Sequence, residues 1–332
     1  MNAALPHVSV VGAGRMGEGI ALAFIYAGLP VSLIDIKDRT EDERHGYFER
    51  VRNNLRGELQ TLVRLGLLQA DQADVALSRL VVQSRSAAGA TLGMCDLVFE
   101  AVPEVIDVKQ QTFAWVSEHV GPEAIIASTT STFLVTELAD MVREPQRFVN
   151  AHWLNPAHLM PLVEVSRSDA TCPRVVERLL QLLKRIGKVP VVCNPVAGYI
   201  VPRIQALAMN EAARMVEEGV ASAEDIDTAV RVGFGLRFSV LGLLEFIDWG
   251  GGDILYYASR YLSDALSPRF ESPQVIADNM QNARNGLRDG QGFYDYRDLN
   301  VDAYKQQRLA AFVRKLELSG LTPEFDGALQ QD

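Results

Sequence analysis

The chain has 332 residues, of which 42 are acidic and 32 are basic, and its formal net charge at pH 7 is −10. A negative charge of this size repels a phosphate backbone and gives no general attraction to an anionic membrane surface, so we expect neither nucleic-acid nor membrane partners. The hydrophobic fraction of 48% is typical of globular proteins, and at roughly 150 residues per domain the length predicts about two domains.

Three cysteines lack the short spacings of zinc sites and predict reduced thiols, which favours a cytoplasmic protein. The five histidines also show no ligand spacing, so no metal is expected. The longest uncharged stretch, 19–34, falls short of the roughly 20 apolar residues that a membrane-spanning helix needs. The apolar N-terminal run lacks a basic leader, so it does not predict a secretory signal.

Up to about residue 193, short β-branched runs alternate with longer amphipathic stretches, a pattern that predicts β-α-β units building a parallel sheet. The predicted strands cover residues 7–11, 31–35, 80–83, 97–102, 124–128, 148–151, 162–165 and 189–193. Between the second and third strands, residues 42–68 are charged and spaced like a helix or a helical hairpin.

After residue 194 the pattern becomes helical and no convincing strand follows. Helices are predicted over residues 199–218, 223–232, 254–266, 275–283 and 301–318. The expected fold class is α/β, with a Rossmann-type dinucleotide-binding domain over residues 1–194 followed by an all-helical domain over residues 195–325.

The first strand runs directly into Gly12-Ala-Gly14-Arg-Met16-Gly17, and a helical pattern follows. Gly12 permits a tight turn, Gly14 lets the backbone approach a pyrophosphate, and Gly17 allows the helix to pack closely on the sheet. Strand, glycines and helix occur in the order that a dinucleotide site requires. The bound group is therefore expected to be NAD or a related dinucleotide, with FAD as an alternative.

The second strand ends at Asp35, where a carboxylate accepts hydrogen bonds from a ribose diol and repels a 2′-phosphate. This position favours NAD over NADP. Lys37 and Arg39 follow closely and could soften that preference, although the favoured interpretation is that they are solvated loop charges.

A histidine, His152, lies at the C-terminal end of the predicted strand 148–151, the edge at which open α/β sheets bind ligands. Its imidazole can take a hydroxyl proton near neutral pH. Glu164, in an apolar strand, needs a partner and is expected to orient the imidazole. The hydroxyls of residues 128–132, including Ser131, could hold a substrate oxygen or cap the following helix.

Together these residues resemble the 3-hydroxyacyl-CoA dehydrogenase family, including its gulonate and carnitine dehydrogenase-like relatives. The resemblance spans nearly the whole chain. It rests on the glycine fingerprint, Glu100-Ala-Val-Pro-Glu104 with Lys109, the serine-threonine run, His152-Trp-Leu-Asn155-Pro156, Pro161-Leu-Val-Glu164-Val165, Gly198-Tyr-Ile-Val201, the helical segment 218–227 and Gly290-Gln-Gly292-Phe-Tyr294.

The resemblance implies NAD-dependent oxidation of a 3-hydroxyacyl-CoA to a 3-ketoacyl-CoA by hydride transfer, as in fatty acid metabolism. It makes His152 the acid/base, Glu164 its orienting partner and Ser131 the holder of the substrate oxygen, with Asn155 near the substrate. It implies a helical domain that closes the cleft and forms a homodimer. The implied cofactor-binding residues are Gly12, Gly14, Met16, Gly17, Asp35, Glu104 and Lys109.

Two departures from the family pattern leave the substrate open. Pro202 occupies the position of a family asparagine that helps to hold the substrate. Arg237 lies in a segment, 233–242, that resembles relatives oxidising small hydroxy acids, and it could bind a substrate carboxylate or simply pair with a surface acid. The alternatives are a dehydrogenase of a small free hydroxy acid, resembling gulonate, carnitine or pyridine-carboxylate dehydrogenases, and a non-catalytic NAD-binding protein.

Overall fold

The computed structural model describes residues 5–322. Its contacts divide the chain into two compact units, with the division between Met209 and Asn210, inside helix α8 (Val201–Glu217). The first half of α8 therefore belongs to the sheet-containing unit, although sequence patterning places the division after residue 194. The predicted end of the second domain, at residue 325, lies outside the described residues.

The first unit is built on one sheet with the strand order β3-β2-β1-β4-β5-β6-β7-β8. Within residues 5–322 all eight predicted strands are present, with bounds that differ from the predicted ones by at most two residues at either end. They are β1 Val8–Val11, β2 Val31–Asp35, β3 Leu80–Ser84, β4 Leu97–Glu100, β5 Ile125–Ser128, β6 Phe148–Trp153, β7 Leu162–Ser166 and β8 Val189–Cys193.

The prediction of a wholly parallel sheet is wrong for the last two strands. β7 runs antiparallel to β6, and β8 is parallel to β7. The connection between β6 and β7 covers only residues 154–161, which is too short for the helical crossover that parallel neighbours need. The antiparallel register places His152 directly opposite Glu164.

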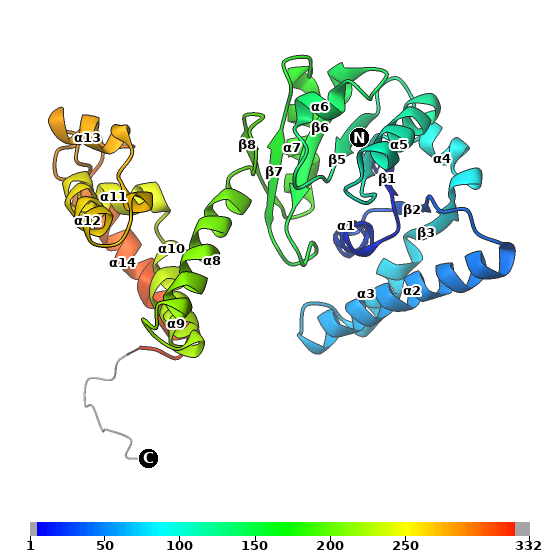
Figure 1. Cartoon of the computed structure of the whole chain (residues 1–332). Helices are drawn as coiled ribbons and strands as arrows, with labels where there is room; N and C mark the ends of the chain where they lie inside the picture. The colour runs from blue at the N-terminus through cyan, green and yellow to red at the C-terminus, as the bar shows by residue number, and fades with distance from the viewer. Residues whose placement is uncertain (1–4, 323–332) are drawn as a thin grey trace. The chain divides into compact units, whose positions relative to one another are not determined.

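Helices cover both faces of the sheet (Figure 1). Because side chains alternate along each strand, Val10 and Phe99 pack with one set of helices and Val11 and Val98 with the other. The first set is α1 (Arg15–Tyr26), α2 (Glu41–Arg64), α3 (Ala70–Ser78) and α7 (Pro173–Arg185), and the second is α4 (Gly89–Gly93), α5 (Ile106–His119) and α6 (Val135–Ala139).

The charged segment predicted over residues 42–68 forms a helical hairpin of α2 and α3, seen as the long blue helix and its neighbour in Figure 1. α2 begins with a capping box in which Thr40 and Glu43 bind each other's backbone N–H groups. Only one side of α2 is apolar, with Val51, Leu55 and Leu59 buried against the sheet unit. The other side stays charged and exposed, as its composition predicts.

The second unit is helical throughout its described part, with isolated β-bridges but no strand. A π-helical segment at Val230–Gly235 follows α9, and the helices α10 and α11 were not predicted. After α8, the helices are α9 (Ala223–Ala229), α10 (Leu236–Phe238), α11 (Leu243–Gly250), α12 (Gly252–Ala265), α13 (Gln274–Gln281) and α14 (Val301–Leu318).

Asp248, a buried carboxylate on α11, organises the segment around residues 290–294. It accepts hydrogen bonds from the backbone N–H groups of Phe293 and Tyr294, both at 2.9 Å, and from the hydroxyl of Tyr296 at 3.1 Å. A Cβ on Gly292 would lie 2.1 Å from an oxygen of this carboxylate. The glycine motif at this end of the chain therefore has a packing role within the helical unit.

Candidate active site

The glycine fingerprint connects β1 to α1, and each glycine has a distinct steric environment. Gly12 has a φ of 110°, and an added Cβ would lie 2.5 Å from the carbonyl oxygen of Ala101. A Cβ on Gly17 would lie 1.8 Å from the oxygen of Gly12, whereas no atom lies within 4 Å of one on Gly14. Gly14 caps α1 without a side chain, so the N-terminal N–H groups of the helix stay open to an anion. This geometry fits a dinucleotide pyrophosphate. Met16 packs against the core.

Asp35 lies at the end of β2, beside the fingerprint, as predicted. The backbone N–H of Gly12 donates to the carbonyl of Ile34, which ties the loop to this strand. The carboxylate of Asp35 is buried, and its Oδ2 accepts a hydrogen bond of 2.6 Å from Nε of Arg39. The acid predicted to receive a ribose diol is thus already paired with a cation.

His152 and Glu164 form a buried hydrogen-bonded pair between β6 and β7. Nδ1 of His152 lies 2.8 Å from Oε2 of Glu164. The other carboxylate oxygen, Oε1, accepts hydrogen bonds of 2.9 Å from the backbone N–H groups of Ile200 and Val201 at the start of α8. Because Nδ1 is occupied, Nε2 is the ring nitrogen left to exchange a proton with a substrate.

Tyr199 is a site residue that the sequence did not predict. Its ring stacks on the imidazole of His152, with 4.8 Å between centroids and 16° between planes. Its hydroxyl donates to the carbonyl of Thr130 at 3.0 Å and accepts from Nδ2 of Asn150 at 3.1 Å. Burial raises the pKa of Tyr199, so the phenol stays neutral. The aromatic residue after Gly198 was the available signal, but only the fold brings it onto His152.

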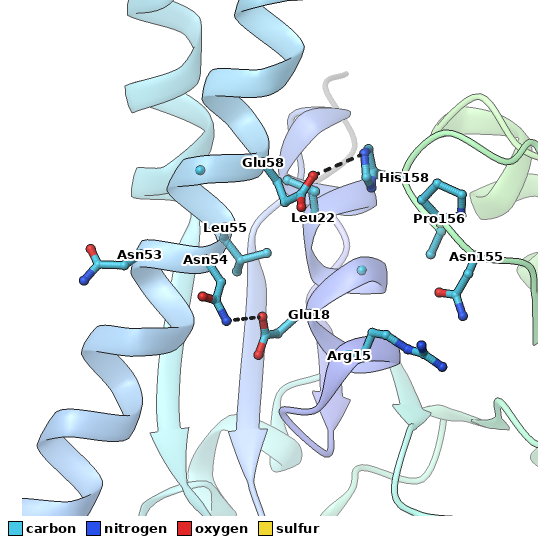
Figure 2. Close-up of a pocket in the computed structure, with 13 residues that line it drawn as sticks. Arg15, Glu18, Leu22, Asn53, Asn54, Leu55, Glu58, Asn155, Pro156 and His158 are labelled. Atoms are coloured by element: carbon cyan, nitrogen blue, oxygen red, sulfur yellow. Dashed lines mark hydrogen bonds and ion pairs between the residues drawn. The ribbon is translucent and has the colours of Figure 1, made fainter.

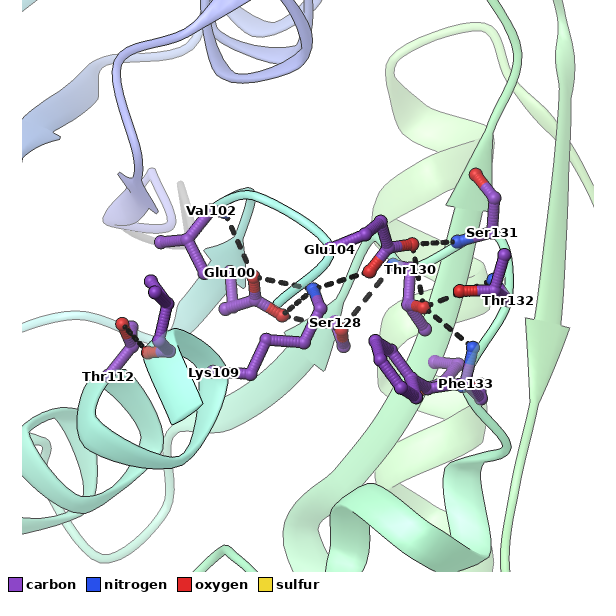
Figure 3. A network of polar contacts seen from close by, with 12 residues as sticks. Glu100, Val102, Glu104, Lys109, Thr112, Ser128, Thr130, Ser131, Thr132 and Phe133 are labelled. Atoms are coloured by element: carbon purple, nitrogen blue, oxygen red, sulfur yellow. Dashed lines mark hydrogen bonds and ion pairs between the residues drawn. The ribbon is translucent and has the colours of Figure 1, made fainter. Parts of the chain in front are cut away.

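A buried ionic network lies at the ends of β4 and β5 (Figure 3). Nζ of Lys109, almost fully buried, lies 3.0 and 3.1 Å from the two oxygens of Glu100 and 3.1 Å from Oε2 of Glu104. Glu100 also accepts from the hydroxyl of Ser128 at 2.5 Å and from the N–H of Val102 at 2.9 Å. Glu100 was not assigned a role from sequence, although a carboxylate that ends an apolar strand was a usable signal.

Glu104 carries this network to the serine-threonine loop. Its Oε1 accepts hydrogen bonds from the N–H of Ser131 at 2.6 Å and from the hydroxyl of Thr130 at 2.8 Å. Burial alone would raise the pKa of Glu104, but Lys109 and these hydrogen bonds together lower it below its ordinary value. The backbone of Ser131 is therefore fixed while its side chain remains exposed, as Figure 3 shows.

A groove of about 850 Å³ lies beside the fingerprint, between α1, α2 and the loop after β6 (Figure 2). Asn155, the predicted substrate neighbour, lines it. Glu18 is half-buried and accepts from the amide of Asn54 at 3.1 Å, and burial raises the pKa of its carboxyl. Burial lowers the pKa of His158, whose ring lies 3.9 Å from the carboxylate of Glu58.

The two departures noted in the sequence have separate structural settings. Pro202 lies in the first turn of α8, where its missing N–H removes no helical hydrogen bond. Arg237 belongs to the helical unit, where its guanidinium lies 4.7 Å from the ring of Phe246. In the described part of the chain Arg237 forms no ion pair. Residues 5–322 contain neither a cluster of metal-ligating side chains nor a helix long and apolar enough to cross a membrane.

A mostly parallel sheet with a glycine fingerprint at the start of its first helix defines the class of dinucleotide-binding α/β proteins. The family model for the 3-hydroxyacyl-CoA dehydrogenase NAD binding domain matches residues 7–196, and that for the C-terminal domain matches residues 198–296. The chain therefore belongs to the 3-hydroxyacyl-CoA dehydrogenase family, and its N-terminal domain is an NAD-binding domain. The family expected from the motifs is confirmed.

Similar proteins differ in the substrates that their names state. A 5-formyl-3-hydroxy-2-methylpyridine 4-carboxylate 5-dehydrogenase of Mesorhizobium japonicum is 30% identical over 92% of this chain and 96% of its own length. A 3-hydroxybutyryl-CoA dehydrogenase of Bradyrhizobium diazoefficiens is 32% identical over 90% of this chain and 97% of its own length. The crystal structure of a 3-hydroxyacyl-CoA dehydrogenase from Archaeoglobus fulgidus superposes with a TM-score of 0.73 and 30% sequence identity. The match covers 96% of this chain and 100% of that chain.

Proposed function

We propose that this protein is an NAD-dependent dehydrogenase that oxidises a secondary alcohol to a ketone, with a 3-hydroxyacyl-CoA as substrate. The observation that carries the proposal is the buried pair of His152 and Glu164 at the ligand-binding edge of the sheet. The family assignment and the relatives named for 3-hydroxyacyl-CoA substrates support the reaction class.

In this mechanism Nε2 of His152 takes the hydroxyl proton of the alcohol. Bound NAD supplies the hydride acceptor. The carboxylate of Glu164 accepts the Nδ1–H, which fixes the ring tautomer and stabilises the imidazolium that forms. The hydroxyl of Ser131, on a loop held by Glu104, binds the substrate oxygen. General base catalysis of this kind contributes about 10²–10⁴-fold to the rate, and reduction uses the same groups in reverse.

In this proposal different residues hold different parts of NAD. The glycine fingerprint receives the pyrophosphate at the N-terminus of α1, and Asp35 lies at the adenine ribose. Glu104 is partly exposed and free to contact the cofactor. Lys109 is about 1% exposed, so we assign it the role of holding Glu104 rather than direct contact.

A small free hydroxy acid is the second candidate substrate. The residues lining the groove beside Asn155 carry two carboxylates, Glu18 and Glu58, against one guanidinium, Arg15, and no lysine, a net negative environment that disfavours the phosphates of CoA. Arg237 has no ion-pair partner among the described residues and could receive a substrate carboxylate. The relative named as a pyridine-carboxylate dehydrogenase matches almost its whole length here.

We further propose a homodimer formed through the helical unit. After Met209, the buried apolar side chains of the described residues are few, namely Ile226, Leu241, Ile276, Leu287 and Tyr296. Large apolar side chains on α12 and α14, such as Tyr257, Tyr261 and Leu309, are exposed. A second copy would cover such surfaces, and light scattering that gives the mass of one chain would contradict this assignment.

The deciding experiment follows NADH formation by the purified protein with 3-hydroxybutyryl-CoA and, in parallel, with the free acids gulonate, carnitine and 3-hydroxybutyrate. Preference for the thioester supports the proposal. Turnover of free acids alone overturns the CoA substrate and makes Arg237 the next residue to change. NAD binding without turnover of either class would indicate a non-catalytic NAD-binding protein.

A further inference from the structure

The adenine-ribose end of the cofactor site presents a cation rather than a free carboxylate. Nε of Arg39 donates to Oδ2 of Asp35 at 2.6 Å, and the backbone N–H of Lys37 donates to Oδ1 at 3.3 Å. The Asp35 side chain is 5% exposed and that of Arg39 is 20% exposed. The guanidinium of Arg39 is therefore the more exposed member of this ion pair at the end of β2.

Arg39 is also held in position by an aromatic ring. Its Cζ lies 3.8 Å from the centroid of Tyr47, which is a cation–π distance. The hydroxyl of Tyr47 donates to the carbonyl of Ala13 at 2.5 Å, inside the glycine fingerprint. Tyr47 thus fixes Arg39 next to the loop that receives the pyrophosphate.

The guanidinium of Arg39 has hydrogen-bond donors that are not used within residues 5–322. Among the described residues, the side chain of Arg39 donates only through Nε, so its two terminal nitrogens have no protein acceptor. A guanidinium binds phosphate oxygens bidentately through such groups. Lys37 is exposed nearby, while the opposing charge comes from the exposed Asp38 and the acids of the first turn of α2. The local pair of Asp35 and Arg39 is neutral, so it lacks the net negative charge that repels a 2′-phosphate.

We propose that this site takes NADP as well as NAD, with the terminal nitrogens of Arg39 as ligands of the 2′-phosphate. Asp35 serves the ribose hydroxyl of NAD, and the same carboxylate orients Arg39 when the phosphate is present. The inference rests on the NAD-binding domain and not on the identity of the alcohol, so it stands or falls independently of the proposed substrate.

The test is a fluorescence titration of the protein with NADH and with NADPH, which measures both dissociation constants without any turnover. For the unmodified protein we expect the two constants to differ by less than about 100-fold. In Arg39→Ala the constant for NADPH should rise by about tenfold or more, because a charge-assisted hydrogen-bond donor to the phosphate is lost. Binding of NADH should tighten, because Asp35 is released from its partner.

Matched variants separate this effect from net charge and from misfolding. Arg64→Ala removes the same charge from the far end of α2, which bears on neither ligand. Arg39→Lys keeps the positive charge but lacks the planar guanidinium. The ratio of its dissociation constants for NADPH and NADH should lie between those of the unmodified protein and Arg39→Ala. The proposal is overturned if the dissociation constant for NADPH exceeds that for NADH by more than about 100-fold in the unmodified protein. It is also overturned if the ratio of the two dissociation constants changes equally in Arg39→Ala and Arg64→Ala.

Discussion

His152 and Glu164 face each other across the only antiparallel pairing in the described sheet, with 2.8 Å between Nδ1 and Oε2. The connection after β6 is too short for the helical crossover that a parallel β7 would need, so β7 turns back along β6 and its register places Glu164 opposite His152. The reversal of strand direction is thus what assembles the proposed acid/base pair.

Replacement of His152 by alanine should lower kcat by about 10²–10⁴-fold, because the proton acceptor is removed. NADH binding should persist, since the fingerprint and Asp35 are untouched. Steady-state rates and a NADH titration check the two parts separately. Activity equal to that of the unmodified protein would contradict the mechanism.

Glu164→Gln tests the orienting role of the carboxylate. The amide oxygen can still accept from the N–H groups of Ile200 and Val201, so the start of α8 should be retained. The amide nitrogen cannot accept the Nδ1–H, so the wrong tautomer is favoured and kcat should fall by up to about 10⁴-fold. In a His152→Ala background the same change should have little further effect. Additive losses in the double variant would argue against a functional pair.

Glu104→Gln should make the free energy of unfolding less dependent on pH in the acidic range. The folded-state pKa of Glu104 lies below its ordinary value of 4.5, so its ionised form stabilises the fold above that pH. This contribution is lost as the pH falls through the lowered folded-state pKa. Urea unfolding at several acidic pH values should therefore show a shallower decline for Glu104→Gln than for the unmodified protein. Parallel curves would show that the carboxylate does not hold the loop.

Glu18→Gln should raise the melting temperature at neutral pH. Burial raises the pKa of Glu18 above its ordinary value of 4.5, so the ionised carboxylate destabilises the fold at pH 7. Glutamine removes the charge and keeps an oxygen for the amide of Asn54. Below pH 4.5 the carboxyl is increasingly protonated in both states, and the difference between the two proteins should vanish. A lower melting temperature for the variant at pH 7 would show that the charge is stabilising.

Gly292→Ala should destabilise the helical unit by about 2 kcal/mol or more. The new Cβ would displace the carboxylate of Asp248 and break buried hydrogen bonds from Phe293 and Tyr294, each worth about 1–3 kcal/mol. Gly250→Ala is the control, since an added Cβ there meets no atom within 4 Å. Thermal unfolding that is equal for both variants would contradict the packing role.

Much of the sheet follows from the sequence because β-branched runs and crossover helices leave a periodic signal. Strand direction does not follow, because alternation is the same in both directions, and only the short link between Trp153 and Leu162 indicates the reversal. The pairing of His152 with Glu164 was predicted from chemistry, and the structure places their side chains 2.8 Å apart, while their catalytic role stays a prediction.

Apart from the pairing of His152 with Glu164, contacts between distant segments were not predicted. The stacking of Tyr199 on His152 and the link from Glu100 through Lys109 to Glu104 join residues on separate elements. Their identities were visible in the sequence, but their geometry depends on tertiary packing. The ion pair of Asp35 with Arg39 joins residues only four positions apart, but its geometry, on which the proposed binding of NADP rests, is known only from the structure.

Glu164 also anchors the first turn of α8 through the N–H groups of Ile200 and Val201. A helix N-terminus favours negative charge, so this carboxylate is shared between a helix and the imidazole that gains a proton in each proposed cycle. In the proposed mechanism one side chain therefore serves both the imidazolium and the N-terminus of α8, so removal of the Glu164 side chain would take the support from the base and from the start of the helix together.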